Sequence, residues 1–255
     1  MSLRFHEIAE THHRILNPFS EDQIDLLGGI CDLRPGMRHL DLACGKAEML
    51  CRWARDHDIR GVGVDISAVF LAAARLRAAE LGVADKVTLV QGDAALHPQP
   101  TREYDVVSCI GATWIGNGLL GTLALMKPAL RPGGLLLVGE PYWIEPPPVD
   151  AYDVLGVGRD DYLSLDGTLD RFESAHLDLV EMVLASQEGW DRYQAPQWRA
   201  IHDFLVAHPD DPDAVALRDW VRSARLGYLR YGRRYLGWGV FVLREASDSV
   251  RGKPR

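Results

Sequence analysis

The chain has 255 residues, which is enough for one domain with a large core or for one domain that carries an inserted segment. Its net charge of −8 argues against broad binding to nucleic acid, which depends on a basic surface. No apolar run is long enough to span a bilayer, and the N-terminus has no signal pattern. The 4 cysteines have no metal or redox spacing. We therefore expect a cytoplasmic protein that does not enter a membrane.

Residues 1–36 have a helical pattern and are expected to form an N-terminal helical lid. Ser20 is followed by acidic residues and is a favourable helix N-cap. His6, His12 and His13 lie close together in the sequence. We predict no metal site there, because no carboxylate completes a ligand set.

Residues 37–67 predict a strand, a helix and a second strand. The apolar run 37–44 stops at Gly45, residues 49–57 have helical spacing, and a second apolar run covers 61–64. A strand, a helix and a strand within about thirty residues are typical of a parallel sheet.

Two acidic residues in this unit indicate the kind of ligand. Asp65 ends the second strand, where an acid can bind the two hydroxyls of a ribose. Asp41 precedes the turn, which has Ala43 and Ala47 on either side of Gly45. A pyrophosphate needs several glycines in this turn and would be repelled by Asp41. S-adenosylmethionine (SAM), which has a ribose, an ammonium and a sulfonium, fits this pattern.

The next elements extend the sheet. Ser67 begins a predicted helix over 68–81, and a third strand covers 86–91 and is followed by Asp93. A fourth strand covers 104–110, a helix covers 119–130, and a fifth strand covers 135–140. The acids after the first three strands all lie at the carboxyl edge of the predicted sheet, where ligands bind in such folds. Trp114, in the loop after the fourth strand, could pack on a sulfonium or could simply anchor the loop.

The motifs 40–47 and 63–67 resemble those of the class I SAM-dependent methyltransferases. Segments 13–19, 111–115, 139–143, 187–193 and 237–241 are similar to a subfamily of bacterial small-molecule methyltransferases of unassigned substrate. The resemblance implies a seven-stranded Rossmann-like α/β sheet with helices on both faces. It also implies that an acid after the third strand binds the adenine amino group and that the next backbone N–H binds a ring nitrogen. The expected cofactor-binding residues are Arg14, Asp41, Ala43, Gly45, Asp65, Ile66, Asp93, Ala94, Ile110 and Trp114.

About fifty residues separate the sixth predicted strand, 179–186, from the seventh, 237–244, and this is far longer than a hairpin loop. Residues 149–177 before them are expected to be loop and then a helix over 169–177. The insertion has helical patterns over 195–207 and 213–235 and is expected to be a substrate cap. Its aromatic residues are either a core stripe or a pocket for the acceptor. Its arginines (Arg222, Arg225, Arg230, Arg233 and Arg234) could pair with an anionic substrate.

The expected domains are a lid over 1–36, a SAM-binding core over 37–189 and 236–247, a cap over 190–235 and a disordered polar tail over 248–255. In related folds the lid covers the cofactor, so that Arg14 could meet the methionine carboxylate. The expected substrate-binding residues are His12, Tyr142, Trp143, Trp190, Tyr228 and Tyr231, and the candidate general bases are His13, Glu140 and Tyr193.

The expected function is methyl transfer from SAM to a small-molecule acceptor. Three alternatives remain open at this level. The first is a regulatory protein that binds SAM without catalysis. The second is a nicotinamide-dependent oxidoreductase, which would need a turn with three glycines. The third is a nucleic-acid methyltransferase. The sequence does not determine the acceptor, the atom that is methylated or the oligomeric state.

Overall fold

The computed structural model describes residues 2–246, and their strands form one seven-stranded sheet in the order β3-β2-β1-β4-β5-β7-β6. The strands are β1 (Arg38–Leu42), β2 (Arg60–Asp65), β3 (Val87–Gln91), β4 (Tyr104–Ile110), β5 (Leu130–Trp143), β6 (Leu177–Leu184) and β7 (Leu236–Glu245). Strands β1 to β5 pair in parallel, whereas β7 runs antiparallel to both of its neighbours. The predicted methyltransferase-type sheet is confirmed. The predicted tail, 248–255, lies outside the described residues.

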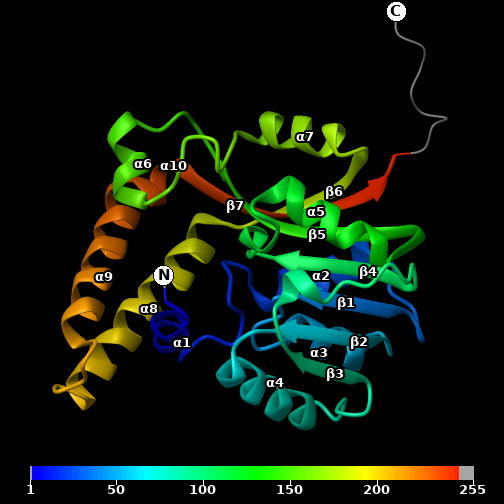
Figure 1. Ribbon diagram of the computed structural model, residues 1–255, viewed down its shortest axis with the longest axis horizontal. Coiled ribbons are helices and arrows are strands. Elements are labelled where there is room, and N and C mark those ends of the chain that lie inside the picture. The colour runs from blue at the N-terminus through cyan, green and yellow to red at the C-terminus, as the bar shows by residue number, and fades with distance from the viewer. Residues whose placement is uncertain (1, 247–255) are drawn as a thin grey trace, which may run out of the picture.

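Helices cover both faces of the sheet (Figure 1). They are α1 (Leu3–Ala9), α2 (Glu21–Ile30), α3 (Glu48–Asp56), α4 (Ala68–Glu80), α5 (Leu119–Met126), α6 (Val149–Leu155), α7 (Leu165–Ser174), α8 (Gln187–Ala207), α9 (Ala214–Gly227) and α10 (Arg233–Tyr235). Short 3-10 helices are η1 (Ala94–Leu96), η2 (Thr113–Gly116) and η3 (Lys127–Ala129), and η4 (Tyr228–Gly232) is a π-helical turn.

The two faces of the sheet bury separate apolar clusters. On one face Leu27 of α2, Trp53 of α3 and Ala74 of α4 pack in a single cluster with strand residues. On the other face Met126 of α5 and Phe172 of α7 pack against the sheet. Because strand side chains alternate between faces, β4, β5 and β7 supply residues to both clusters. These strands are therefore packed on both faces.

Several predicted boundaries hold and several are corrected. Ser20 caps α2 in a capping box with Gln23. The segment 149–155 was expected to be loop but forms α6, and the helix expected at 169–177 is α7, which begins at Leu165. The cap helix expected to begin at residue 195 begins eight residues earlier, because Ser186 accepts a hydrogen bond from Gly189 N and Pro196 is tolerated inside the helix.

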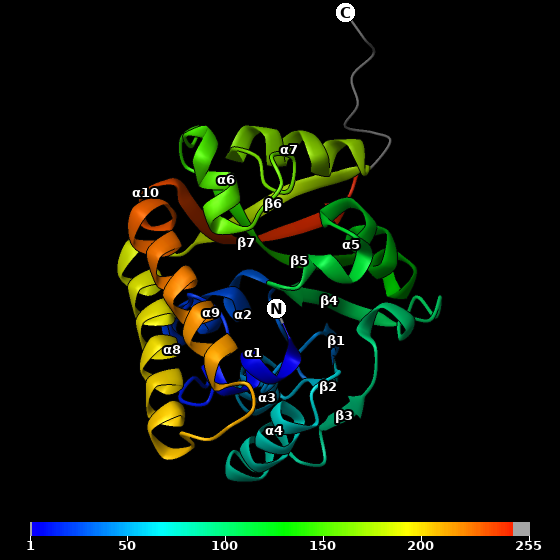
Figure 2. The same ribbon diagram turned by 60° about the vertical axis from the view of Figure 1, so that its left-hand side comes forward.

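Helices α1, α8 and α9 lie beyond the end of the sheet at which the parallel strands stop (Figures 1 and 2). A third apolar cluster, separate from the two sheet clusters, joins them through Ala9, Ile201 and Leu217. All three of these side chains are almost fully buried. The N-terminal helix and the insertion therefore pack as one unit. From here on, the word lid means this unit (α1, α8 and α9) and no longer residues 1–36.

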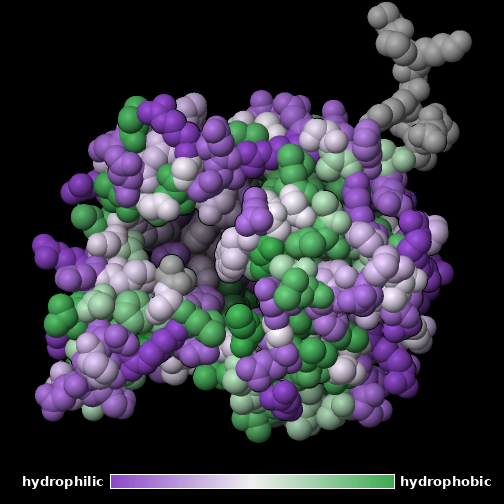
Figure 3. All heavy atoms as spheres, in the orientation of Figure 1, coloured by the Kyte–Doolittle hydropathy of each residue, from purple (hydrophilic) through white to green (hydrophobic). Residues whose placement is uncertain are grey.

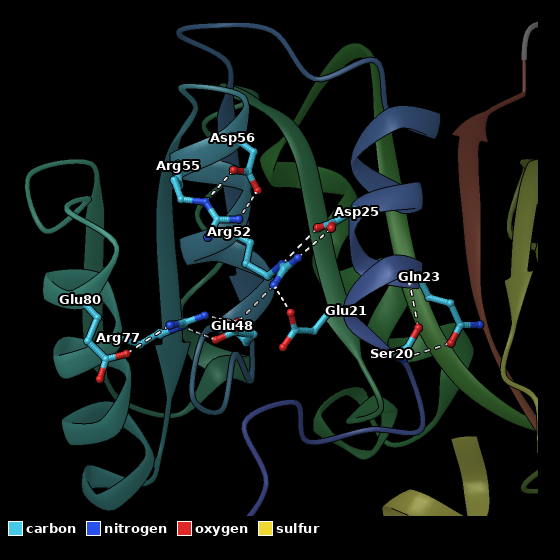
Figure 4. Close-up of polar contacts among 10 residues, drawn as sticks. All are labelled: Ser20, Glu21, Gln23, Asp25, Glu48, Arg52, Arg55, Asp56, Arg77 and Glu80. Atoms are coloured by element: carbon cyan, nitrogen blue, oxygen red, sulfur yellow. Dashed lines mark hydrogen bonds and ion pairs between the residues drawn. The ribbon is translucent and has the colours of Figure 1, made fainter. Parts of the chain in front are cut away.

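A network of buried ion pairs links α2, α3 and α4 (Figure 4). Arg52 of α3 donates to Asp25 at 2.7 Å and to Glu21 at 2.7 Å, both on α2. Glu48 of α3 accepts two hydrogen bonds from Arg77 of α4, each of 2.8 Å. Arg77 and Glu48 are only 14% and 2% exposed, so water screens their pair weakly, whereas the Glu21 and Asp25 partners of Arg52 are 59% and 47% exposed and are screened more. Since Glu48 directly follows the turn after β1, the network also holds that turn.

We expect Arg52→Met to lower the free energy of unfolding by about 1–3 kcal/mol, because it removes charge-assisted hydrogen bonds from a buried guanidinium. Arg55→Met is the matched control, since Arg55 is 38% exposed and pairs with the adjacent Asp56. The control should cost less than about 0.5 kcal/mol. Urea denaturation measures both values, and equal losses would contradict a structural role for the network.

Candidate functional site

A cavity of about 960 Å³ lies between the carboxyl edge of the sheet and the lid. The space-filling view shows this side of the molecule hollowed between the region of α8 and α9 and the region of the sheet (Figure 3). All of the expected cofactor-binding residues line the cavity: Arg14, Asp41, Ala43, Gly45, Asp65, Ile66, Asp93, Ala94, Ile110 and Trp114. The sequence therefore located one continuous site.

The turn after β1 has an unusual backbone. Ala43, Gly45 and Ala47 have φ angles of 55°, 55° and 53°. This left-handed region favours glycine, and an alanine there costs on the order of 1 kcal/mol. The strain explains why glycine would suit the two positions that are alanine here. At Gly45 a Cβ would lie 2.7 Å from Leu16 Cδ1, so an alanine there would also force the end of the Leu16 side chain to move.

Asp65 holds the turn from the end of β2. Its Oδ2 accepts a hydrogen bond from Gly45 N and its Oδ1 accepts one from Ser67 N, both of 2.8 Å. Burial raises the pKa of this carboxyl, and the two backbone hydrogen bonds oppose the rise. Each carboxylate oxygen keeps a further lone pair, so the group can still accept two ribose hydroxyls.

Asp41 lies in a buried chain of polar side chains. Strand register places it beside Ser108 of β4, whose hydroxyl donates to Asp41 Oδ1 at 2.6 Å. His39 Nε2 lies 2.7 Å from the same hydroxyl oxygen. Burial lowers the pKa of His39 to about 3, so the imidazole is neutral and donates to Ser108. Burial also raises the pKa of Asp41 to about 7, although the Ser108 hydrogen bond opposes it.

The remaining predicted cofactor residues form an open side of the cavity. Asp93 caps η1 by accepting a hydrogen bond from Ala95 N at 2.9 Å. Ile66 and Trp114 are 59% and 70% exposed, which is unusual for large apolar side chains. An apolar pair beside an acid can hold a flat ring, with the acid at its polar edge.

The lid is tied to the turn after β1 by Lys46. Its ammonium donates to the carbonyls of Glu10, Thr11 and His13 at 2.7, 3.3 and 2.5 Å. A second tie joins α1 to the start of α4, where Ser67 Oγ donates to Glu7 Oε1 at 2.6 Å. These bonds close the lid over the edge of the sheet.

Glu10 is a site residue that the sequence did not reveal. Its carboxylate is fully buried, lies 2.9 Å from His13 Nδ1 and accepts a hydrogen bond from Gln197 Nε2 at 3.0 Å. Burial and this carboxylate raise the pKa of the Tyr193 phenol well above its usual value. Glu10, Gln197 and Tyr193 all line the cavity, whereas His13 lies behind Glu10. The sequence offered one signal for this contact, which is the spacing of three residues between Glu10 and His13.

Among residues 2–246, no group of three or more histidine, cysteine, aspartate or glutamate side chains has a geometry that could hold a metal ion. Within the same residues, no helix is both long and apolar enough to cross a membrane.

Some predicted site residues lie outside the cavity. Glu140 is buried on β5 and accepts a 2.6 Å hydrogen bond from Thr113. Tyr142 packs in the core, where its ring would contact any Cβ at Gly237, and Trp143 packs against Tyr152. Strand β5 continues to Trp143 and pairs with β7, which explains why these side chains are buried in the sheet.

The other predicted substrate-binding residues, from the N-terminal segment and the cap, also lie outside the main cavity. His12 lies 3.9 Å from Asp203 on the surface, and Tyr231 donates to Asp150. Trp190 and Tyr228 line a smaller cavity next to the main one. None of the five cap arginines lines either of these cavities; Arg233 pairs with Asp191 and Arg234 with Glu145.

Comparisons with known proteins agree with the geometry. A family model described as "Methyltransferase domain" matches residues 40–134. The uncharacterized protein YjhP of Escherichia coli is 45% identical over 94% of this chain and 97% of its own length. A crystal structure of a SAM-dependent methyltransferase from Geobacter sulfurreducens, in complex with S-adenosyl-L-homocysteine, is 46% identical and superposes with a TM-score of 0.91 over 96% of this chain and 98% of that chain. The 27-O-demethylrifamycin SV methyltransferase of Amycolatopsis mediterranei is 31% identical over 68% of this chain and 64% of its own length.

Glu140 should make stability depend on pH. Burial raises its pKa from 4.5 to about 7, so the folded protein binds this proton more tightly than the unfolded chain does. Stability should therefore fall as pH rises from about 4.5 to about 7 and level off above that.

We expect Glu140→Gln to remove a decrease on the order of 2 kcal/mol between about pH 5 and pH 8, measured by urea denaturation. Glu145→Gln is the control, since Glu145 is 46% exposed and pairs with Arg234. The assignment fails if the Glu140 variant and wild type keep parallel stability curves.

Proposed function

We propose that this chain, which belongs to the SAM-dependent methyltransferases, transfers the methyl group of SAM to a small-molecule acceptor held beneath the lid. The observation that carries this proposal is the single cavity, which extends from the acids at the sheet edge to Gln197 and Trp220 in the lid. Its volume of about 960 Å³ is sufficient for a nucleoside cofactor and a small acceptor together.

The cofactor half of the cavity lies at the sheet edge. In this proposal Asp65 accepts the ribose hydroxyls, Asp93 and the Ala94 backbone bind the adenine, and Asp41 faces the positively charged groups. Arg14, which is exposed and lines the cavity, pairs with the methionine carboxylate. The spacing and chemistry of these donors and acceptors fit SAM. Bound SAM supplies a methyl group that is already activated, so the protein contributes mainly by positioning the reactants.

The acceptor half lies under α8 and α9. Tyr193 has a strongly raised pKa, so at neutral pH it keeps its proton and acts as a hydrogen-bond donor. Glu10 is the carboxylate on this side of the cavity, and we propose that it takes up the proton when the acceptor loses one. His13 Nδ1 lies 2.9 Å from this carboxylate but does not form a hydrogen bond with it. Glu140 is not part of this proposal, since Thr113 binds it outside the cavity.

Two observations support a small acceptor. The polar groups of the acceptor half are few, and the lid closes over them. The relative from Amycolatopsis mediterranei is named as a methyltransferase for 27-O-demethylrifamycin SV. The outward-facing cap arginines give no support for an anionic acceptor.

Incubation with radiolabelled SAM and fractionated metabolite pools tests methyl transfer directly. Label in a small-molecule fraction supports the proposal. Tight SAM binding without transfer to any pool would favour a regulatory SAM-binding protein instead.

We expect Asp65→Asn to weaken SAM binding on the order of 100-fold, because the ribose hydroxyls lose a charged acceptor and one of the two backbone N–H groups, of Gly45 or Ser67, loses its oxygen partner to the amide NH2. Calorimetry measures the affinity, and the more disruptive Asp65→Ala should abolish binding. Unchanged affinity in a folded Asp65→Ala protein would refute the ribose assignment.

SAM affinity should also depend on pH through Asp41. The carboxyl has a pKa of about 7 in the ligand-free protein and must ionise to face a cation. Affinity should therefore be roughly five- to tenfold weaker at about pH 6 than at about pH 7.5. Asp41→Asn should flatten most of this dependence. A slope that persists unchanged in the variant would assign it to another group, such as Asp65.

A further inference from the structure

A second cavity of about 190 Å³ lies next to the main one. Its walls come from α6, α8, α9, η4 and the first residue of β7: Val154, Leu155, Trp190, Gln194, Ala224, Gly227, Tyr228, Gly232 and Leu236. Gln194 and Ala224 line both cavities, so the two spaces meet at these side chains. We call this second space the side pocket.

The backbone of η4 gives the side pocket part of its shape. A wide π-helical turn covers Tyr228–Gly232, and such turns are frequent at functional sites. Gly227 and Gly232 stand at the start and end of this turn. A Cβ at Gly232 would lie 3.2 Å from the Tyr228 ring, and one at Gly227 would lie 3.2 Å from the Val154 carbonyl. The turn therefore brings α6 close to α9 without filling the pocket.

The side pocket is lined by uncharged side chains, of which Gln194 and Tyr228 carry polar groups. The indole Nε1 of Trp190 is buried and has no hydrogen-bond partner. This nitrogen has almost no accessible surface, so a ligand in the pocket meets it only when the ring shifts. A buried polar group without a partner costs on the order of 1–3 kcal/mol, so a ligand that accepts its hydrogen bond then gains affinity. The hydroxyl of Tyr228 is already engaged, since it donates to Asp191 at 2.7 Å. No lysine, arginine, aspartate or glutamate lines the pocket.

We propose that the side pocket binds the non-reacting end of the methyl acceptor, and that this end is a neutral, ring-sized apolar group with a carbonyl or ether oxygen for the Trp190 indole. This inference rests on the proposed function, because it places the acceptor across both cavities. Its volume suits a single ring, since apolar cavities of about 150 Å³ hold benzene. Gln194, at the junction, is then the polar side chain nearest the connection between the two ends.

The test uses acetophenone as the probe and ethylbenzene as its isostere without an oxygen. Both are titrated into the full-length protein saturated with S-adenosylhomocysteine, and ¹⁵N-labelled indole resonances are followed by NMR. Acetophenone should shift the Trp190 indole resonance in a saturable way and bind roughly five- to tenfold more tightly than ethylbenzene. The internal control is Trp143, whose Nε1 is also buried without a partner but which packs against Tyr152 outside the pocket.

Two variants separate recognition from folding. Trp190→Phe should remove the preference for acetophenone over ethylbenzene while both still bind. Leu155→Phe should block both probes and leave the affinity for S-adenosylhomocysteine unchanged, since Leu155 lines only the side pocket.

The inference is overturned if acetophenone leaves the Trp190 resonance unmoved, binds no more tightly than ethylbenzene, or shifts Trp143 equally. Calorimetry with S-adenosylhomocysteine on the same samples distinguishes a failure of the side-pocket assignment from a failure of the proposed function. If that ligand binds and the probe does not, the side-pocket assignment fails alone. If that ligand does not bind, the proposed function fails, whatever the probe does.

Discussion

The carboxylate of Asp65 is the constraint on which the rest of the site depends. It accepts hydrogen bonds from the backbone N–H groups of Gly45 and Ser67, so one side chain fixes both the turn after β1 and the start of α4. Ser67 in turn caps α4 and donates to Glu7 of α1. The position of the lid over the sheet is therefore linked to the end of β2. Burial disfavours the charged carboxylate, and the two backbone bonds compensate in part.

The two ends of the main cavity differ in their physical character. At the sheet edge, acidic side chains are held by backbone or hydroxyl donors, which suits a cofactor with hydroxyls and positive charge. Under the lid, Tyr193 and Gln197 surround a single carboxylate, and the adjoining side pocket is lined by uncharged side chains. The sheet thus forms the charged end of the main cavity, and the lid helices, which share a small apolar cluster of their own, form the other end.

Local patterns in the sequence were sufficient to predict that the acids of the sheet edge lie together at one cavity. Asp41, Asp65 and Asp93 each follow or end a strand, and parallel strands bring such positions to one edge whatever the details of packing. Glu10 could not be predicted in this way. Its contact with Gln197 joins residues 187 positions apart, and only the packing of α1 against α8 brings them together.

The second feature that the sequence did not predict was the direction in which side chains point. Tyr142 and Trp143 were expected in a pocket because an apolar strand had seemed to stop before them. Instead β5 continues through them, and pairing with Gly237 and Leu236 of β7 places both in the packed sheet. The cap arginines show the same limit, since helical spacing reveals a basic face but not whether it points inward.

The lid has a consequence for protein engineering. Its apolar cluster takes Ala9 from the start of the chain and Ile201 and Leu217 from the insertion, so the unit over the acceptor is discontinuous in sequence. A chimera that exchanges 187–235 alone would pair a foreign insertion with the original first helix and leave this small cluster mismatched. Exchanging residues 2–17 together with the insertion moves the whole unit. It would transplant the lid side of the main cavity onto an unchanged sheet, provided that Lys46 still meets three backbone carbonyls, whose positions depend little on side-chain identity.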